Sequence, residues 1–304
     1  MDMMIIIMHQ ILIMIIMMLV GFLTKKINLL SNIGVHEITN ILLYIITPVV
    51  IIDAYTIPYT SDKAEKLLVC FILSIFIHLF FICIARLIFK GKGVDQNAVI
   101  LSNSGFMGIP LIMAVLGQDS VFFLSAYMAV NAIVQWTYGV AVLDADYRFD
   151  VKKVLFSPIM ISSMAALLIF FLQLPLPNIL LSSFDYIKNL NTPLAMIVLG
   201  SYITQVNFRM IYKNIRSILK PVIYRLILLP LSCLPGLLLI PESLYEIKVV
   251  HLILVSAPTA ISVALFSEKY GQDTPLAVQI ICLSTILCLF TIPLLVLLFT
   301  LLSF

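Results

Sequence analysis

Charged residues are scarce in this sequence. Aspartate, glutamate, lysine and arginine make up 11% of its 304 residues, whereas a typical soluble domain carries about 25%. Hydrophobic residues make up 62%. A soluble fold of this length could not cover so much apolar surface, so we expect an all-α protein embedded in a membrane. The net charge is only +3 and the basic residues lie in short loops, so nucleic acid is not an expected partner.

The sequence also lacks the motifs of common enzyme classes. His36-Glu37 is followed by Ile38-Thr39-Asn40, so the HExxH spacing of zinc proteases is absent. There is no Walker A lysine motif, no GxSxG turn and no Cys/His metal cluster. We therefore expect neither an enzyme nor a cofactor or metal site, and an ATP-driven pump would need a separate motor subunit.

Two further absences bear on processing and redox state. The first apolar run, 3–20, has no basic flank and no clear cleavage site, so we expect a retained first helix instead of a signal peptide. No disulfide framework is expected, because all the cysteines fall in apolar segments: Cys70, Cys83, Cys233, Cys282 and Cys288.

Long apolar runs predict ten membrane-spanning helices, since about 20 apolar residues cross the hydrocarbon core. These runs are 3–24, 34–55, 65–89, 97–117, 121–143, 154–172, 184–206, 215–240, 247–268 and 274–302. Two halves, 1–143 and 154–304, hold five runs each and are joined by a linker over 144–153.

The basic residues predict an orientation. The loops after odd-numbered runs, together with the run ends beside them, hold Lys25, Lys26, Arg86, Lys90, Lys92, Arg148, Lys152, Lys153, Arg209, Lys213, Arg216, Lys220 and Lys269. The loops after even-numbered runs, with the run ends beside them, hold only Lys63, Lys66, Lys188 and Lys248. Because cytoplasmic loops carry the excess of lysine and arginine, both termini should lie outside the cytoplasm, in a multi-pass protein of the cell membrane.

Two sequence landmarks recur in the same order in both halves. Gln118-Asp119-Ser120 follows the fourth run and Gln272-Asp273-Thr274 follows the ninth. Thr47-Pro48 in the second run recurs as Thr192-Pro193 in the seventh, and both pairs should break or kink their helices. Since each half has an odd number of helices, the second half would enter the membrane inverted relative to the first, as in many secondary transporters.

Two runs contain residues that interrupt a helix inside the membrane. Residues 103–110 read NSGFMGIP, and residues 255–262 read VSAPTAIS. Backbone groups freed by such a break are tolerated only inside protein or beside a polar cavity. A simple proline kink is the alternative for Pro258. We favour a crossed pair of broken fourth and ninth helices.

The crossing supplies the candidate binding residues. Free N–H groups and the positive ends of half-helices favour an anion, so no lysine or arginine is required. Asn131 and Gln135 share a helical face and either line the cavity or bond neighbouring helices. The candidates are Asn103, Ser104, Gly105, Gly108, Pro110, Asn131, Gln135, Ser256, Pro258 and Thr259.

Three ionisable residues within the runs need separate interpretation. Asp53 is either interfacial or linked to proton movement, and His78 is either a satisfied core group or a protonation site. Arg225 in the eighth run either balances the charge of an anion or extends to the cytoplasmic surface, and we favour the second.

The NSGFMGIP run, Gly117, and the APTA run followed by Tyr270-Gly271-Gln272-Asp273 resemble the auxin efflux carrier family. The resemblance covers essentially the whole chain, although the long central loop of many plant exporters is absent. It implies a fold similar to that of bile-acid–sodium symporters, with the first, second, sixth and seventh helices as scaffold and the others as transport domain. It also implies that Asn103 and Pro110 match the first crossing and Pro258 the second, and that the substrates are weak organic acids, such as auxin, malate or malonate.

We therefore expect a secondary carrier of small organic anions that works by alternating access. A sodium-coupled symporter of the bile-acid type is the alternative within transport, and a channel or a non-transporting sensor is the alternative outside it. Proton or sodium coupling, and assembly as a homodimer, are left open by the sequence.

Overall fold

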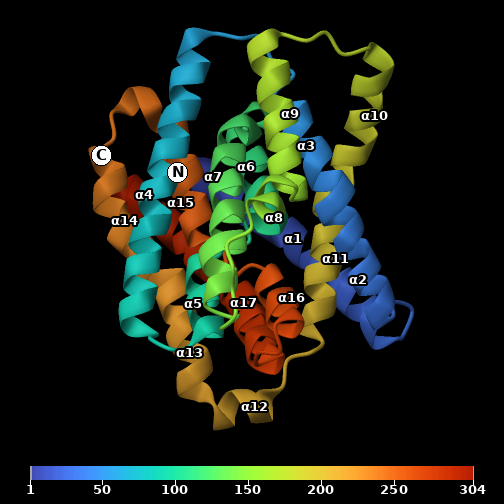
Figure 1. Ribbon diagram of the computed structural model, residues 1–304, viewed down its shortest axis with the longest axis vertical. Coiled ribbons are helices and arrows are strands. Elements are labelled where there is room, and N and C mark those ends of the chain that lie inside the picture. Colours follow the sequence, from blue (N-terminus) through green and yellow to red (C-terminus); the bar gives the residue numbers. More distant parts are fainter. Residues whose placement is uncertain (1, 304) are drawn as a thin grey trace.

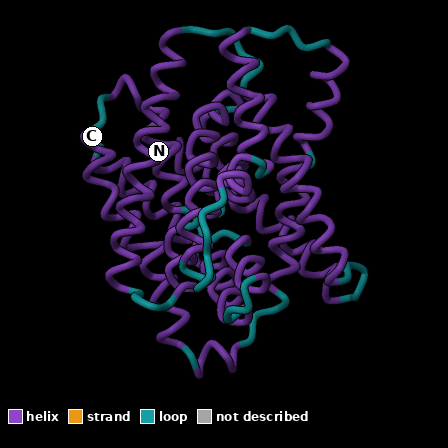
Figure 2. Tube along the Cα trace, viewed as in Figure 1, coloured by secondary structure: helices purple, strands orange, loops and turns teal. Residues whose placement is uncertain are grey.

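The computed structural model describes residues 2–303, which are helical apart from loops and one isolated bridge between Ser102 and Thr259. The helices are joined by mostly short loops (Figure 2). Within residues 2–303, six helical segments are long and apolar enough to cross a membrane, accompanied by the shorter apolar helices Ser104–Leu116 and Pro158–Leu172. The predicted class, an all-α membrane protein, is confirmed.

The first half of the chain contains two long uninterrupted helices, α1 and α4, and three segments built from shorter pieces (Figure 1). Here η denotes a π-helical or 3₁₀ turn. The bounds are α1 Asp2–Lys26, α2 Asn32–Ile41, η1 Leu42–Ile46, α3 Thr47–Ala54, α4 Ser61–Ile88, α5 Gly93–Ile100, η2 Ser104–Gly108, α6 Ile109–Leu116, η3 Gln118–Ser120, α7 Val121–Val134 and η4 Gln135–Gly139.

The second half ends in the longest helix, α17. Its bounds are α8 Val151–Leu155, α9 Pro158–Leu172, α10 Asn178–Asn189, α11 Asn191–Ile203, α12 Phe208–Lys213, α13 Ile215–Ile223, η5 Tyr224–Leu228, α14 Leu229–Leu239, η6 Glu242–Leu244, α15 Tyr245–Ser256, α16 Ser262–Lys269 and α17 Thr274–Leu302.

Helices extend beyond two of the predicted ranges. The seventh run was expected from residue 184, but α10 already begins at Asn178. The start of this exposed helix is missed by hydropathy, because Ser182, Ser183 and Asp185 make it polar. The linker expected over 144–153 contains the start of α8, where the Asp150 carboxylate accepts a hydrogen bond from the Lys152 N–H and caps the helix.

Three π-helical turns stand just before a proline. η1, η2 and η5 each end two residues before Pro48, Pro110 and Pro230, respectively. A proline lacks an N–H donor and its ring clashes with the carbonyl four residues earlier, and a π turn widens the helix at that place. Of the two outcomes expected at Thr47-Pro48, a break or a kink, the break is wrong, because the chain stays helical through both residues. The seventh segment, by contrast, is interrupted at Leu190, two residues before Thr192-Pro193.

Glycines allow α1 and α11 to pack backbone against backbone. A Cβ atom at Gly21 would lie 2.2 Å from the Ile197 carbonyl oxygen, and one at Gly200 would lie 1.9 Å from the Met18 carbonyl oxygen. Small residues permit such close helix contacts in membranes, where packing and not the hydrophobic effect drives association.

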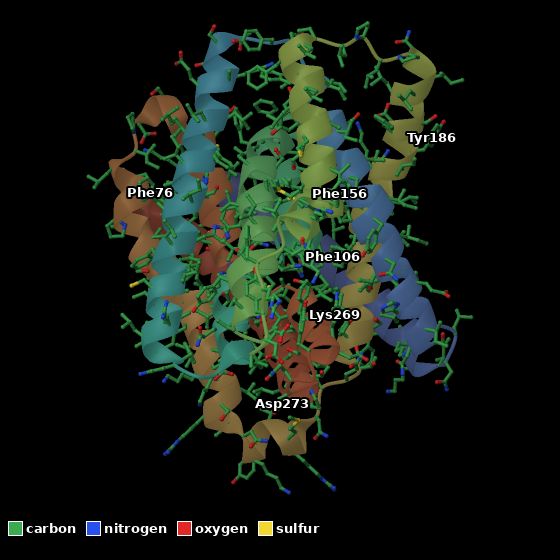
Figure 3. The ribbon with its side chains drawn as sticks, in the orientation of Figure 1. Phe76, Phe106, Phe156, Tyr186, Lys269 and Asp273 are labelled. Atoms are coloured by element: carbon green, nitrogen blue, oxygen red, sulfur yellow. The ribbon has the colours of Figure 1, made fainter. Side chains whose placement is uncertain are left out.

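Large apolar side chains cover much of the outer surface. Phe76 on α4 and Tyr186 on α10 lie at opposite edges of the molecule in Figure 3, with 65% and 80% of their surface exposed. An apolar surface of this extent would be unfavourable in water and is suited to lipid.

Candidate functional site

The two predicted helix breaks are present, and they meet. The chain leaves its helix at Leu101 and again at Ala257, and the two short extended segments pair antiparallel at Ser102 and Thr259. The Asn103 N–H donates to the Pro258 carbonyl at 2.8 Å, and the Ala260 N–H donates to the Leu101 carbonyl at 3.0 Å. Each break thus satisfies backbone groups of the other, as buried polar backbone requires.

Four half-helix ends meet at the crossing, two with free carbonyl groups and two with free N–H groups. α5 and α15 end at the crossing, so their carbonyl ends carry partial negative charge. The helices that start with η2 and α16 begin there, so their N–H ends carry partial positive charge.

Arg225 binds the carbonyl ends. Its guanidinium is fully buried and donates to the carbonyls of Ala257 at 2.9 Å, Val99 at 3.1 Å and Leu254 at 3.2 Å, with a longer bond to Ile100 at 3.4 Å. The expectation that Arg225 extends to the cytoplasmic surface is therefore wrong. The physical reason is that the breaks leave carbonyls without helical partners, and these replace water around the guanidinium.

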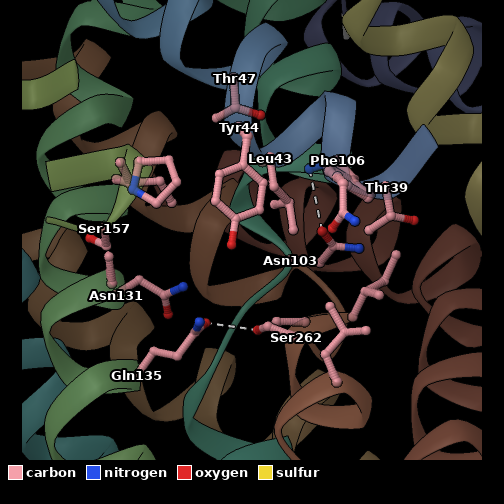
Figure 4. Close-up of a pocket in the computed structure, with 18 of the residues that line it drawn as sticks. Thr39, Leu43, Tyr44, Thr47, Asn103, Phe106, Asn131, Gln135, Ser157 and Ser262 are labelled. Atoms are coloured by element: carbon pink, nitrogen blue, oxygen red, sulfur yellow. Dashed lines mark hydrogen bonds between the residues drawn. The ribbon is translucent and has the colours of Figure 1, made fainter. Parts of the chain in front are cut away.

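A cavity of about 870 Å³ lies on the N–H side of the crossing. Ligand pockets commonly measure about 300–1,000 Å³, so its size suits a small molecule. Both breaks, the α7–η4 segment and the α2–α3 segment contribute to its wall (Figure 4). Its polar lining includes Thr39, Thr47, Asn103, Ser104, Asn131, Gln135, Ser157 and Ser262.

The cavity is open to the surface along η1, where the exposed Tyr44 and Ile45 line it, and at a mouth beside α2 and α16. Its wall runs from the buried Asn103 and Asn131 to the exposed side chains of His36, Glu268 and Lys269. These three residues lie on α2 and on the last turn of α16, so the mouth is where α2 begins and α16 ends.

Asn103 lines the cavity and has an unused hydrogen-bond donor. Its side-chain oxygen caps η2 by accepting from the Phe106 N–H at 3.3 Å. Its amide nitrogen Nδ2 is buried and has no hydrogen-bond partner among the described residues. The backbone N–H groups of Ser104 and Gly105, in the first turn of η2, have no preceding helical carbonyl, and both residues line the same wall. These groups form a cluster of donors suited to an anionic or carbonyl-bearing ligand.

Asn131 and Gln135 lie on one face toward the cavity, as their spacing predicts (Figure 4). They also bond neighbouring helices, so both sequence interpretations hold. Asn131 accepts from the Ser102 N–H and donates to the Ser102 carbonyl, each at 3.4 Å. Gln135 accepts from the Ser262 hydroxyl at 2.8 Å.

The other candidates at the breaks lie outside the cavity wall. A Cβ atom at Gly108 would lie 2.7 Å from a Leu254 methyl carbon, so this glycine permits helix packing. Pro110 is buried in the first turn of α6. Pro258 contributes its carbonyl to the crossing, as described above.

Ser256 and Thr259 are also held away from the wall. Ser256 is buried, and its hydroxyl has no partner among the described residues. The Thr259 hydroxyl donates to the Ala98 carbonyl at 2.8 Å, and its N–H donates to the Ser284 hydroxyl at 3.2 Å. Both residues are placed to support the crossing.

His78 and Asp53 are likewise outside the cavity. His78 is buried on α4, with Nε2 3.3 Å from Asn131 Oδ1 and Nδ1 2.8 Å from the Ser74 carbonyl. Asp53 forms an ion pair with Lys188 at 2.7 Å and accepts from Gln118 Nε2 at 3.0 Å.

Sequence reasoning missed several lining residues, among them Thr39, Tyr44, Trp136, Ser157 and Ser262. Ser262 could have been found, because it lies beside the second break. The others lie in segments whose local sequence contains no break, and only the packing of distant helices brings them to the cavity.

A family model described as membrane transport protein matches the chain twice, over residues 6–146 and 144–296. The chain is 26% identical over 307 residues to Uncharacterized transporter MJ1031 of Methanocaldococcus jannaschii, which covers 94% of this chain and 97% of that relative. Both descriptions are of transporters and neither is of an enzyme, in agreement with the sequence. The chain is a multi-pass membrane protein that belongs to the membrane transport protein family, that of the auxin efflux carriers.

Proposed function

We propose that this protein is a secondary carrier that binds small organic anions in the cavity beside the crossing. One observation supports this proposal above the others: Asn103 lines the cavity, and its buried amide nitrogen has no hydrogen-bond partner in the described structure. A buried donor without an acceptor is costly, so a ligand that supplies the acceptor would bind favourably.

The charge distribution favours an anion over a cation. The half-helix ends at the cavity are N–H ends, with partial positive charge. Arg225 neutralises the carbonyl ends on the other side of the crossing, so these do not offset that charge. The resemblance to auxin efflux carriers adds weak organic acids, auxin-like or malate- and malonate-like, as the substrate class.

We further propose that transport proceeds by alternating access between a scaffold and a transport domain. The scaffold would consist of α1, α2–α3, α9 and α10–α11, and the transport domain of the other membrane helices. The cavity would then lie between these groups, since Thr39 and Ser157 would belong to the first, and Asn103, Gln135 and Ser262 to the second. Two inverted halves, 1–143 and 154–304 with a linker over 144–153, agree with the double match of the family model.

The orientation suggested by the basic residues makes this an inward-open state. Lys269 at the mouth belongs to a loop assigned to the cytoplasm, so the cavity would open inward and both termini would lie outside. At the other end, Tyr55 and Ser125 lie 2.6 Å apart across the proposed domain boundary, and Gln118 bonds Asp53. These contacts would close the outer side, in a carrier of the cell membrane.

Counterflow in liposomes tests this proposal. Purified protein should carry labelled malonate, malate or indole-3-acetate into liposomes loaded with the same unlabelled acid, and the rate should saturate. Flux that is linear in concentration and shows no counterflow would indicate a channel. Saturable binding without flux would indicate a sensor, and no binding of any acid in a screen of dicarboxylates, short monocarboxylates and indole acids would reject the proposed substrate class.

A further inference from the structure

The guanidinium of Arg225 binds the same kind of backbone groups that coordinate a coupling cation in other transporters with broken helices. In such transporters, unwound carbonyls and the C-terminal ends of half-helices coordinate sodium. We propose that Arg225 is a built-in cation at the crossing, which takes the place of sodium so that the carrier works without that ion. This inference rests on the proposed carrier function.

The geometry accounts for the carbonyl ends of both broken helices. Val99 and Ile100 belong to the end of α5, and Leu254 and Ala257 to the end of α15, and all four carbonyl oxygens accept from the Arg225 guanidinium. The side chain has no solvent-exposed surface. A sodium ion at this place would therefore have to displace the guanidinium from its oxygens.

Charge balance supports the same conclusion. Each helix C-terminus carries about −0.5 elementary charge, so the ends of α5 and α15 together balance about one positive charge. The guanidinium supplies that charge. Within residues 2–303 no carboxylate forms an ion pair with Arg225, since the ion pairs found there involve other residues. A second cation would thus be left without compensating negative charge.

Neighbouring side chains hold the guanidinium in place. Its central carbon lies 5.6 Å from the centre of the Phe81 ring on α4. Arg225 itself lies in the widened turn η5, between Pro221 and Pro230. Arg225 is therefore a positioning residue that joins α5, α15 and η5, and it does not touch the cavity where the anion would bind.

Sodium dependence distinguishes a built-in cation from a residue that only packs. The thermal unfolding midpoint of the purified wild-type protein is measured in NaCl and in choline chloride at equal ionic strength, without any organic acid. We expect the same midpoint in both salts. A midpoint that rises in NaCl by several degrees for the wild-type protein would overturn the proposal.

Arg225→Ala supplies the complementary measurement. This variant frees the carbonyls and leaves space, so its midpoint should rise in NaCl over choline chloride by about 5 °C at a sodium concentration well above its dissociation constant. Arg225→Lys keeps the charge and should stay insensitive to sodium.

Arg216→Ala is the matched control, because Arg216 is exposed on the neighbouring α13. A folded Arg225→Ala protein that is equally stable in both salts would overturn the proposal, and the wild-type comparison decides the matter if Arg225→Ala does not fold.

The transport assay separates this inference from the proposed function. Malonate counterflow by the wild-type protein should proceed at the same rate in NaCl and choline chloride. Counterflow that requires sodium would overturn the role of Arg225 while upholding the carrier. If no organic acid is transported in either salt, the carrier proposal fails, and the thermal measurements still decide whether Arg225 excludes sodium.

Discussion

The Tyr55 hydroxyl lies 2.6 Å from the Ser125 hydroxyl, although the two residues are 70 positions apart in the chain. Both side chains are buried at the end of the molecule opposite the cavity mouth. Since the Ser125 hydroxyl donates to the Phe122 carbonyl at 2.7 Å, Tyr55 is the donor in this pair. The bond joins α3 to α7, which we assign to different moving parts.

Removing this bond should favour opening of the outer side. Tyr55→Phe deletes one donor and leaves Ser125 bonded to Phe122, at a cost of about 1 kcal/mol. This should shift the conformational equilibrium several-fold toward the outward-open state. The measurement uses a protein without its native cysteines, in which Val121→Cys introduces one thiol. A membrane-impermeant thiol reagent should therefore react several-fold faster with this thiol when Tyr55→Phe is also present.

Tyr59→Phe provides the control for this experiment. Tyr59 lies at the same end, is exposed, and its hydroxyl makes no hydrogen bond in the described part of the chain. Its replacement should leave the reaction rate of the thiol introduced by Val121→Cys unchanged. Equal rates in Tyr55→Phe and Tyr59→Phe would show that the Tyr55–Ser125 contact does not hold the outer side closed.

Asn103 should contribute directly to ligand affinity. Asn103→Ala removes a buried amide nitrogen that has no hydrogen-bond partner in the described structure, and the loss of one polar contact to the ligand corresponds to about a tenfold weaker Kd. Asn103→Asp should bind still more weakly, because a carboxylate repels an anion. Isothermal titration with the best acid from the binding screen measures both values.

A second asparagine in the cavity wall supplies the comparison. Asn40 lines the cavity nearer the mouth, where its amide nitrogen bonds His36 at 3.2 Å. Asn40→Ala should change the Kd by less than about threefold, since a solvated contact contributes little. An unchanged Kd in Asn103→Ala would place the binding site elsewhere.

The two helix breaks could be read from the sequence because their signal is local. Asn103, Gly105, Gly108 and Pro110 fall within eight residues, and Pro258 stands between small residues in the ninth apolar run. Glycine and proline act on the backbone where they stand, so the break follows from these residues alone.

The role of Arg225 could not be read in the same way. The carbonyls that bind it belong to Val99, Ile100, Leu254 and Ala257, the nearest of which is 29 positions away. Local sequence shows an arginine in an apolar helix, for which extension to the membrane surface is the common outcome. Only the pairing of the two breaks reveals that unbonded carbonyls are gathered at that depth.

His78 and Asp53, the two residues proposed for proton linkage, can be separated by a pH profile. Protonated His78 could donate both to the Ser74 carbonyl and to Asn131 Oδ1, which would fix Asn131 against Ser102 at the crossing. Binding of an acid should then strengthen as the pH falls far enough for His78 to take up a proton. His78→Gln should flatten this profile, whereas Asp53→Asn should keep its shape.

The surroundings of His78 define how this result is interpreted. Its ring lies 4.7 Å from the Tyr127 ring, and Tyr127 lies 6.0 Å from His251, whose Nε2 is 3.0 Å from the Ser74 hydroxyl. His251→Gln is therefore the matched control for a second buried imidazole in the same network. A profile that is flattened only by His251→Gln would assign proton linkage to His251 instead of His78.

Pro258 should matter because it keeps α15 from extending into the crossing. A leucine at this position has an N–H that could donate to the Leu254 carbonyl, the group that now accepts from Arg225. Continuing the helix by this step would also turn the residue 258 carbonyl away from the Asn103 N–H, which it accepts at 2.8 Å. We therefore expect Pro258→Leu to lower counterflow by about tenfold or more, with the protein still folded.

Pro293→Leu is the control, because Pro293 lies inside the unbroken helix α17 and its replacement restores an ordinary helical bond. If both variants transport at the wild-type rate, the pairing of the two breaks is not required for transport.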